Sequence, residues 1–338
     1  MRISKSARAA GVLLAGIAAV LAASRPLRKQ RIDGRCVFIT GGSRGLGLAL
    51  ALEYARRGAN LAICARDAQA LETAAARIRE RGVQALPLPC DVRDAVQMRE
   101  AIAQAYSAFG RIDIVVNNAG TIQVGPMESM TREDFEDSLR THFWAIYEAV
   151  EAVLPIFERA GGGRFVNVTS IGGKVSVPHL LPYCVGKFAA VGYSEGLRSA
   201  LARKNIAVTT VVPGLMRTGS PRNAWFKGQH RKEYAWFSLS DSLPMFSVAA
   251  SSAARAIVDG SLRGAPEVVV SLQAKALLIL QAIAPGLTLR ALEIADALLP
   301  RPGGIETRMA RGHESTSGIT ESPLMALGKK AERDYNQH

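Results

Sequence analysis

Residues 40–47 read Thr40-Gly41-Gly42-Ser43-Arg44-Gly45-Leu46-Gly47 and form a glycine-rich turn. The apolar run Cys36-Val37-Phe38-Ile39 precedes this turn, and a helical pattern from Leu48 to Arg57 follows it. Glycines let the backbone approach a pyrophosphate, and the N-terminus of the following helix favours its negative charge. A glycine turn alone is a weak signal, but a turn between a strand and a helix favours a dinucleotide site.

Strand-like and helix-like segments alternate from Arg35 onward. This alternation predicts an α/β fold with a doubly wound parallel sheet, a Rossmann fold with helices on both faces. We expect strands at 36–39, 61–65, 85–88, 112–116, 165–168 and 208–212. We expect helices at 48–57, 68–81, 132–159 with a break near Pro155, and 183–204.

Three polar side chains downstream of the turn stand in an order that suits proton transfer. Tyr183 and Lys187 are four residues apart, so they share one face of a helix. A neighbouring ammonium is expected to lower the pKa of a tyrosine from about 10 toward working pH, which makes the phenol a usable general acid. Ser170 ends the apolar run 164–169, at the carboxyl edge of the predicted sheet, where ligands bind.

The order of these motifs resembles the short-chain dehydrogenase/reductase family, in its single-domain branch, over residues 32–270. The motifs are the glycine turn, Asn117-Asn118-Ala119-Gly120, Ser170, the Tyr183/Lys187 pair and Pro213-Gly214. The Tyr-x-x-x-Lys spacing by itself is common, so the resemblance depends on the whole set. It implies that Tyr183 protonates a carbonyl oxygen, Ser170 polarises that oxygen and Lys187 also holds the nicotinamide ribose.

The cofactor expected from the sequence is NADP, with NADPH preferred over NADH. The second strand ends in Ala65-Arg66, without the acid that would repel a 2′-phosphate, and Arg66 and Arg44 offer guanidinium groups to that phosphate. The alternative is two solvated surface arginines. The resemblance further implies adenine contacts from Asp91 and Val92. It implies other cofactor contacts from Gly41, Ser43, Gly45, Leu46, Gly47, Asn117, Ala119, Gly120, Tyr183, Lys187, Pro213, Gly214 and Thr218.

His142 departs from the family pattern. Relatives usually carry an asparagine there, in the long helix, and it supports a water that relays protons to the lysine. A histidine at that position can hold the same water or titrate near neutral pH. Alternatively, His142 only fills the interior of the helix.

Composition and charge indicate the cellular environment and the kind of partner that we expect for this protein. The chain has 338 residues, of which 48% are hydrophobic, and a net charge of +13. Its four cysteines, Cys36, Cys64, Cys90 and Cys184, lack metal-type spacing, so no metal is expected, and reduced buried thiols indicate a cytosol-facing domain. The basic excess lies in residues 1–35 and 195–235. No base-reading module accompanies it, which argues against nucleic acid and favours an anionic membrane surface.

The N-terminal segment 1–31 contains an apolar run at 9–23 with basic flanks. As a helix it would span about 22 Å, short of a hydrocarbon core of ~30 Å. We expect an uncleaved anchor or interfacial helix on the cytoplasmic face of a membrane; a cleaved signal peptide and a disordered extension are the alternatives. After the catalytic domain 32–270 we expect an apolar helical hairpin at 271–299 and a mobile tail at 300–338.

The substrate is expected to be a hydrophobic, lipid-like ketone. The segment after Pro213-Gly214 gathers aromatic and basic residues in 225–227 and 231–237, which suits an apolar substrate or lipid headgroups, although ordinary packing of a lid explains it equally well. The predicted enzyme reduces a ketone, or oxidises a secondary alcohol, on such a molecule. The alternatives are a noncatalytic dinucleotide-binding scaffold and a nucleotide-sugar epimerase or dehydratase. The sequence leaves a homo-oligomer open.

Overall fold

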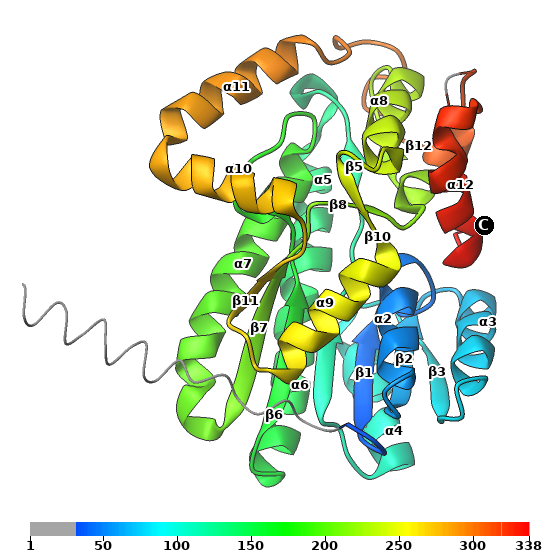
Figure 1. Ribbon diagram of the computed structural model, residues 1–338, viewed down its shortest axis with the longest axis vertical. Helices are drawn as coiled ribbons and strands as arrows, with labels where there is room; N and C mark the ends of the chain where they lie inside the picture. Colours follow the sequence, from blue (N-terminus) through cyan, green and yellow to red (C-terminus); the bar gives the residue numbers. More distant parts are fainter. Residues whose placement is uncertain (1–31, 319, 338) are drawn as a thin grey trace, which may run out of the picture.

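Seven parallel strands form the central sheet of the computed structural model, which describes residues 32–318 and 320–337 (Figure 1). The strand order is β11-β7-β6-β4-β1-β2-β3. The strands are β1 (Cys36–Thr40), β2 (Asn60–Ala65), β3 (Ala85–Pro89), β4 (Ile114–Asn117), β6 (Gly163–Val168), β7 (Ile206–Val212) and β11 (Glu267–Val269). The predicted fold class is confirmed, and β11 is a strand that the sequence did not predict.

Two apolar cores lie on the two faces of this sheet. Successive residues of a strand point to opposite faces, so Val37 and Ile39 of β1 join one core while Cys36 and Phe38 join the other. The first core is covered by α2 (Gly45–Ala55), α3 (Ala68–Arg79) and α9 (Ala250–Leu262). The second is covered by α4 (Ala95–Phe109), α6 (Ala145–Arg159) and α7 (Leu181–Leu201). All four cysteines are buried and unpaired, as the sequence predicts.

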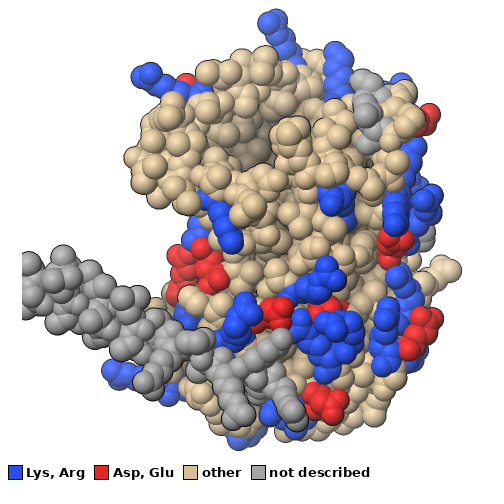
Figure 2. Space-filling model, in the orientation of Figure 1, with Lys and Arg blue, Asp and Glu red and all other residues tan. Residues whose placement is uncertain are grey.

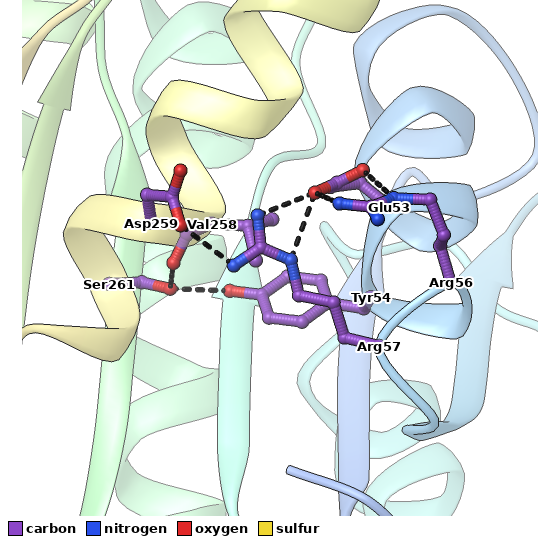
Figure 3. A network of polar contacts seen from close by, with 7 residues as sticks. All are labelled: Glu53, Tyr54, Arg56, Arg57, Val258, Asp259 and Ser261. Atoms are coloured by element: carbon purple, nitrogen blue, oxygen red, sulfur yellow. Dashed lines mark hydrogen bonds and ion pairs between the residues drawn. The ribbon is translucent and has the colours of Figure 1, made fainter. Parts of the chain in front are cut away.

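A polar network fastens α2 to α9 (Figure 3). The Ser261 hydroxyl donates to the backbone oxygen of Val258, so the fully buried Tyr54 phenol donates to Ser261 Oγ at 2.8 Å. Beside it, Arg57 donates to Glu53 within α2 and to Asp259 of α9, both at 2.9 Å. Burial raises the pKa of Tyr54 to about 12, so the phenol keeps its proton. These contacts fix the helix that begins at the glycine turn.

The long helical stretch at 132–159 differs from its prediction. The structure has α5 (Arg132–Leu139), one wider π-helical turn at Arg140–Trp144, and then α6, which continues through Pro155. The predicted break near Pro155 is therefore wrong. The helical stretch is irregular instead at the π-helical turn Arg140–Trp144, which carries His142. Such π-turns insert an extra residue into a helix and are frequent at functional sites.

The C-terminal third is more ordered than the sequence indicates. Helices α10 (Leu272–Ile283) and α11 (Pro285–Ala297) occupy the predicted hairpin. In place of a mobile tail, strand β12 (Ala310–Arg311) pairs with β9 (Trp225–Phe226), and α12 (Ala326–Asp334) packs against α8 (His230–Ser242). Together with β5 (Gln123–Val124), β9 and β12 form a small second sheet.

Among residues 32–318 and 320–337, no helix has the length and the apolar composition that crossing a membrane requires. The apolar run at 9–23, for which we predicted an anchor or interfacial helix, lies outside these described residues.

Asp241, in α8, is a buried carboxyl group without an ion-pair partner among the described residues. Burial raises its pKa to about 8, although a backbone hydrogen bond from Met216 and the charge of Arg217 oppose the shift. The folded protein therefore binds more protons than the unfolded chain between about pH 4 and pH 8. The contribution of Asp241 to stability is present at low pH and is lost as the pH rises through 8.

We predict that Asp241→Asn stabilises the protein at pH 8 and has little effect at pH 4. The amide keeps an acceptor for the Met216 amide but carries no charge, so the stability difference should grow by up to about 1.4 kcal/mol per pH unit between these limits. Urea unfolding at several pH values measures the difference. Asp334→Asn, at an exposed carboxylate, is the matched control. A difference that does not change with pH would contradict the assignment.

Candidate active site

The glycine turn adopts a conformation that side chains would prevent. Gly41 and Gly45 have φ values of +65° and +56°, in the left-handed region that favours glycine. A Cβ on Gly47 would lie 2.0 Å from the backbone oxygen of Gly41, and a Cβ on Gly41 would lie 2.9 Å from Ala119 Cα. The turn is thus closed tightly on itself and on the loop after β4.

Thr40 and Asn118 hold the turn against that loop. Thr40 Oγ1 accepts hydrogen bonds from the backbone amides of Asn118 and Ala119, at 2.9 and 3.0 Å. Asn118 Nδ2 donates in return to the Thr40 oxygen at 3.0 Å. Asn117, which we expected in the cofactor cleft, turns instead into the sheet, where its Nδ2 donates to Asn167 Oδ1 at 2.9 Å. Asn118 is therefore the asparagine that borders the glycine turn.

Residues near the C-terminus also contact the glycine turn, and no sequence pattern predicts this contact. The backbone oxygen of Tyr335 accepts the Gly45 amide at 2.8 Å, and Asn336 Nδ2 donates to the Ser43 oxygen at 3.0 Å. The first backbone amides of a helix have no acceptor within the helix. The amides of Leu46 and Gly47, at the start of α2, are therefore further hydrogen-bond donors. A turn closed by glycines at a helix N-terminus fits a pyrophosphate.

The residues predicted for the adenosine end lie at the carboxyl edge of β2 and β3. Arg66 is exposed directly after β2, and Arg44 pairs with Asp67 at 3.2 Å. Asp91 pairs with Arg93 at 2.6 Å, and this hydrogen bond lowers the pKa of the Asp91 carboxyl. Val92 is a core residue, only 8% exposed.

The Ser170, Tyr183 and Lys187 side chains converge beside β6. Ser170 follows this strand, accepts the Gly172 amide at 3.0 Å and is hydrogen-bonded to the Tyr183 phenol. Helix α7 carries Tyr183 and Lys187 on one face, with Lys187 Nζ 5.8 Å from the centre of the tyrosine ring. The ammonium donates to the backbone oxygen of Val168 at 2.9 Å, which ties α7 to the end of β6.

Burial governs the protonation of this group. It raises the pKa of Tyr183 to about 12, while the Ser170 hydrogen bond lowers it by a smaller amount. The same burial lowers the pKa of Lys187 to about 7. The sequence predicted a lowered tyrosine pKa, and the structure reverses this direction because burial deprives the phenolate of its solvation.

His142 is buried beside the catalytic group. Its Nε2 lies 2.9 Å from the Thr121 backbone oxygen, which can only accept, so Nε2 carries the proton. Nδ1 is a buried acceptor without a protein partner among the described residues. Its ring meets the Tyr183 ring edge-on at 5.3 Å. Burial and the Lys187 charge hold the pKa of His142 well below its usual range, so the suggestion that it titrates near neutral pH is wrong.

The loop after β7 closes this edge of the sheet. Pro213 accepts the Ile171 amide at 2.8 Å through its backbone oxygen. A Cβ on Gly214 would lie 2.8 Å from Ser271 Oγ, at the start of α10. Thr218 is 4% exposed, and its Oγ1 accepts the Ser220 amide at 3.3 Å. This loop thus contacts Ile171, the residue after Ser170, and lies against the start of α10.

The aromatic segment predicted as a lid forms a third apolar cluster. It contains Phe226, Tyr234 and Phe237, and Tyr183 and Trp236 pack against it. Two of its charged members, Lys227 and Glu233, are paired inside the protein, whereas Arg231 and Lys232 are exposed. Lys227 donates to Asp134 with both side chains 3% exposed, and the fully buried Glu233 accepts hydrogen bonds from His179 and Trp236. Lys227 is therefore not available to lipid headgroups.

Metal-type clusters of His, Cys, Asp or Glu are absent from the described part of the chain.

Known proteins share these features over most of the chain. Residues 35–227 match the family model for short chain dehydrogenases. Human 17-beta-hydroxysteroid dehydrogenase 13 is 33% identical over 205 residues, which cover 59% of this chain and 67% of that protein. D-threitol dehydrogenase of Mycolicibacterium smegmatis is 31% identical over 237 residues, 68% of this chain and 91% of that protein.

A solved structure agrees with these matches. The crystal structure of levodione reductase superposes with a TM-score of 0.63 at 26% identity, over 73% of this chain and 100% of that chain. The chain belongs to the short-chain dehydrogenase family, whose members bind NAD(P) and act as oxidoreductases on alcohol and ketone substrates.

Proposed function

We propose that this enzyme uses NADPH to reduce a ketone on a hydrophobic, lipid-like molecule, with Tyr183 as the proton donor. The observation that carries the proposal is the convergence of Ser170, Tyr183 and Lys187 at the carboxyl edge of the parallel sheet, beside the glycine turn. The reverse reaction, oxidation of a secondary alcohol, uses the same groups. An intact catalytic set disfavours a noncatalytic scaffold.

Each catalytic side chain has a role that follows from its surroundings. The nicotinamide ring of the bound cofactor would supply the hydride. Tyr183, with a pKa of about 12, keeps its proton until the carbonyl oxygen becomes an alkoxide, which is a stronger base than phenolate. Ser170, already hydrogen-bonded to the phenol, can donate to the same oxygen and stabilise its developing charge. Lys187 then stabilises the phenolate.

His142 and Lys187 are placed to return a proton to Tyr183. The position that a Cβ would take on Gly120 lies 3.3 Å from His142 Nδ1 and 3.8 Å from Lys187 Nζ. Because residue 120 is a glycine, it places no side chain between His142 Nδ1 and Lys187 Nζ. A water there would donate to the neutral imidazole and accept from the ammonium. This supports the role that an asparagine has in relatives.

The preference for NADP rests on charge. Arg44 lies in the glycine turn, and Arg66 lies directly after β2. The last residue of β2 is Ala65, so no carboxylate ends that strand. Asp67 pairs with Arg44, so it offsets part of this charge. Arg66 has no carboxylate within ion-pair distance among the described residues, which leaves it available to a phosphate.

The hydrophobic substrate class rests on the apolar cluster of the lid, which adjoins Tyr183. The two relatives named above have different substrate classes in their names, a steroid and a polyol. The lid therefore supports the choice more directly than either name does.

A membrane surface is the proposed setting. The outer faces of α10 and α11 carry apolar side chains that are 54–83% exposed: Leu272, Ile279, Ile283, Leu287, Leu289, Ile294 and Leu298. Figure 2 shows this part of the molecule as largely uncharged, with a hollow beside it. An exposed apolar patch on this scale is unusual in a protein that has no partner there. With the basic, apolar segment 1–31, it would attach the enzyme to the cytoplasmic face of an anionic membrane.

Tyr183→Phe should abolish ketone reduction while NADPH affinity stays within a few fold. The substitution removes the proton donor and leaves the ring that packs on the lid cluster and on His142. Steady-state reduction of a panel of hydrophobic ketones and fluorescence titration with NADPH measure the two effects. Activity close to that of the parent enzyme would refute the mechanism.

His142→Asn should retain most of the activity, and His142→Leu should lower kcat by roughly 10- to 100-fold, because only the first keeps a polar partner for the relay water. Unfolding measurements on both variants separate a structural effect from a relay effect. Since the imidazole stays neutral, the parent pH–rate profile should show no limb that His142→Asn removes. Equal activity in the two variants would mean that His142 only fills space.

Full-length protein should float with phosphatidylserine vesicles, and deletion of residues 1–30 should weaken this binding without loss of turnover on a soluble ketone. Adding Ile283→Glu and Ile294→Glu to the deletion should remove the remaining association. Val96→Glu, at an exposed apolar side chain on α4, is the matched control and should bind like its parent. Full-length protein that stays wholly in the unbound fraction would exclude the membrane proposal.

A further inference from the structure

Arg311, in the C-terminal segment, is held in place by contacts with Trp225 and Asn223. Its guanidinium lies 3.4 Å from the centre of the Trp225 ring, and its Nη1 donates to the Asn223 backbone oxygen at 2.7 Å. Strand pairing between β12 and β9 sets this position, because Arg311 is the register partner of Trp225. Stacking and one hydrogen bond orient the plane of the guanidinium and use only part of its five N–H donors.

A chain of contacts links this arginine to the glycine turn. Asn223 Nδ2 donates to Gln337 Oε1 at 2.7 Å. A Cβ on Gly45 would in turn lie 2.7 Å from Gln337 Nε2, so the tail side chain touches the turn. Asn336 Nδ2 lies next to it, donating to the backbone oxygens of Ser43 and of Ala70. The C-terminal segment therefore contacts both neighbours of Arg44 in the chain.

The charges around Arg311 are mostly positive. Burial lowers the pKa of the Arg311 guanidinium, and the positive charges of Arg66 and Arg44 lower it further. The opposing carboxylates are Glu314, which is exposed and accepts the Arg311 amide, Asp67, which pairs with Arg44, and Asp91, which pairs with Arg93 and also interacts with the charge of Arg66. Arg44, Arg66 and Arg311 come from three separate segments, and their charges lie close enough to interact. A compact dianion would complement these three guanidinium groups.

We propose that Arg311 is a specificity-determining residue, the third member of an arginine cluster with Arg44 and Arg66 that binds the 2′-phosphate of NADP. The inference rests on the proposed NADP preference and adds to it a contribution from residues beyond 35–227, the part that matches the family. A guanidinium already stacked and hydrogen-bonded loses little conformational entropy when it binds phosphate. The C-terminal segment therefore completes a site that the glycine turn and β2 begin.

The test compares adenosine 2′,5′-bisphosphate with 5′-AMP as probes, using calorimetry on the full-length protein. The first probe carries the 2′-phosphate and the second lacks it, and neither requires turnover. Arg311→Gln keeps a side chain that can stack on Trp225 but removes the charge, so it should weaken bisphosphate binding by roughly tenfold or more and leave 5′-AMP within about twofold. Arg311→Lys should fall between the variant and the parent. Arg308→Gln, at an exposed arginine in the same segment, is the matched control.

The outcomes separate the two proposals. If the parent binds both probes equally, the NADP preference itself fails. If the parent prefers the bisphosphate, and Arg44→Ala with Arg66→Ala removes the preference while Arg311→Gln retains it, the NADP preference stands and the role of Arg311 is refuted. Equal weakening of both probes by Arg311→Gln, with an unchanged unfolding transition, would also refute a phosphate contact. Loss confined to the bisphosphate supports it.

Discussion

The close approach of two backbone segments is the constraint on which the site depends. The glycine turn can pack against the loop after β4 only because Gly41 and Gly47 lack a Cβ, and Thr40 and Asn118 hydrogen-bond across the contact. This contact fixes where α2 starts and hence where its free amides point. On the other side of α2, the buried Tyr54 phenol and Arg57 fasten it to α9. The glycine turn therefore keeps its shape through contacts on two sides of the same helix.

Burial affects the protonation of the candidate catalytic group more than charge does. Lys187 and His142 are buried and Tyr183 is partly buried, and in each case burial is the largest cause of the pKa shift. The result is a phenol that holds its proton, a lysine that titrates near pH 7 and an imidazole that stays neutral. No member is held in an ion pair with a carboxylate among the described residues, which is consistent with the proton transfer that we propose.

Local patterns were sufficient to predict the sheet and the proximity of Ser170, Tyr183 and Lys187. Apolar runs ending in glycines or polar residues indicate six of the seven parallel strands, and the four-residue spacing of Tyr183 and Lys187 places them on one helix face. What the sequence could not show depends on contacts between distant segments. The π-turn at His142, the inward turn of Asn117 and the reversed direction of the Tyr183 pKa all follow from packing and burial. Composition also misleads at 300–338, where a polar segment that reads as mobile is anchored by β12 and α12.

The anchored C-terminal segment contributes directly to the part of the structure around the glycine turn. The glycine turn near the start of the domain is contacted by the last residues of the chain, through Tyr335 and Asn336. Asn223 contacts both Gln337 and Arg311. Residues 225–237, the aromatic lid, lie between these contacts and the catalytic tyrosine, with Trp225 under Arg311 and Phe226 in the cluster that Tyr183 adjoins. The two residues of β9 thus contact both ends of the site: Trp225 stacks with Arg311, and Phe226 belongs to the apolar cluster against which Tyr183 packs. A change in the position of this short strand would therefore alter both the proposed phosphate site and the packing around Tyr183.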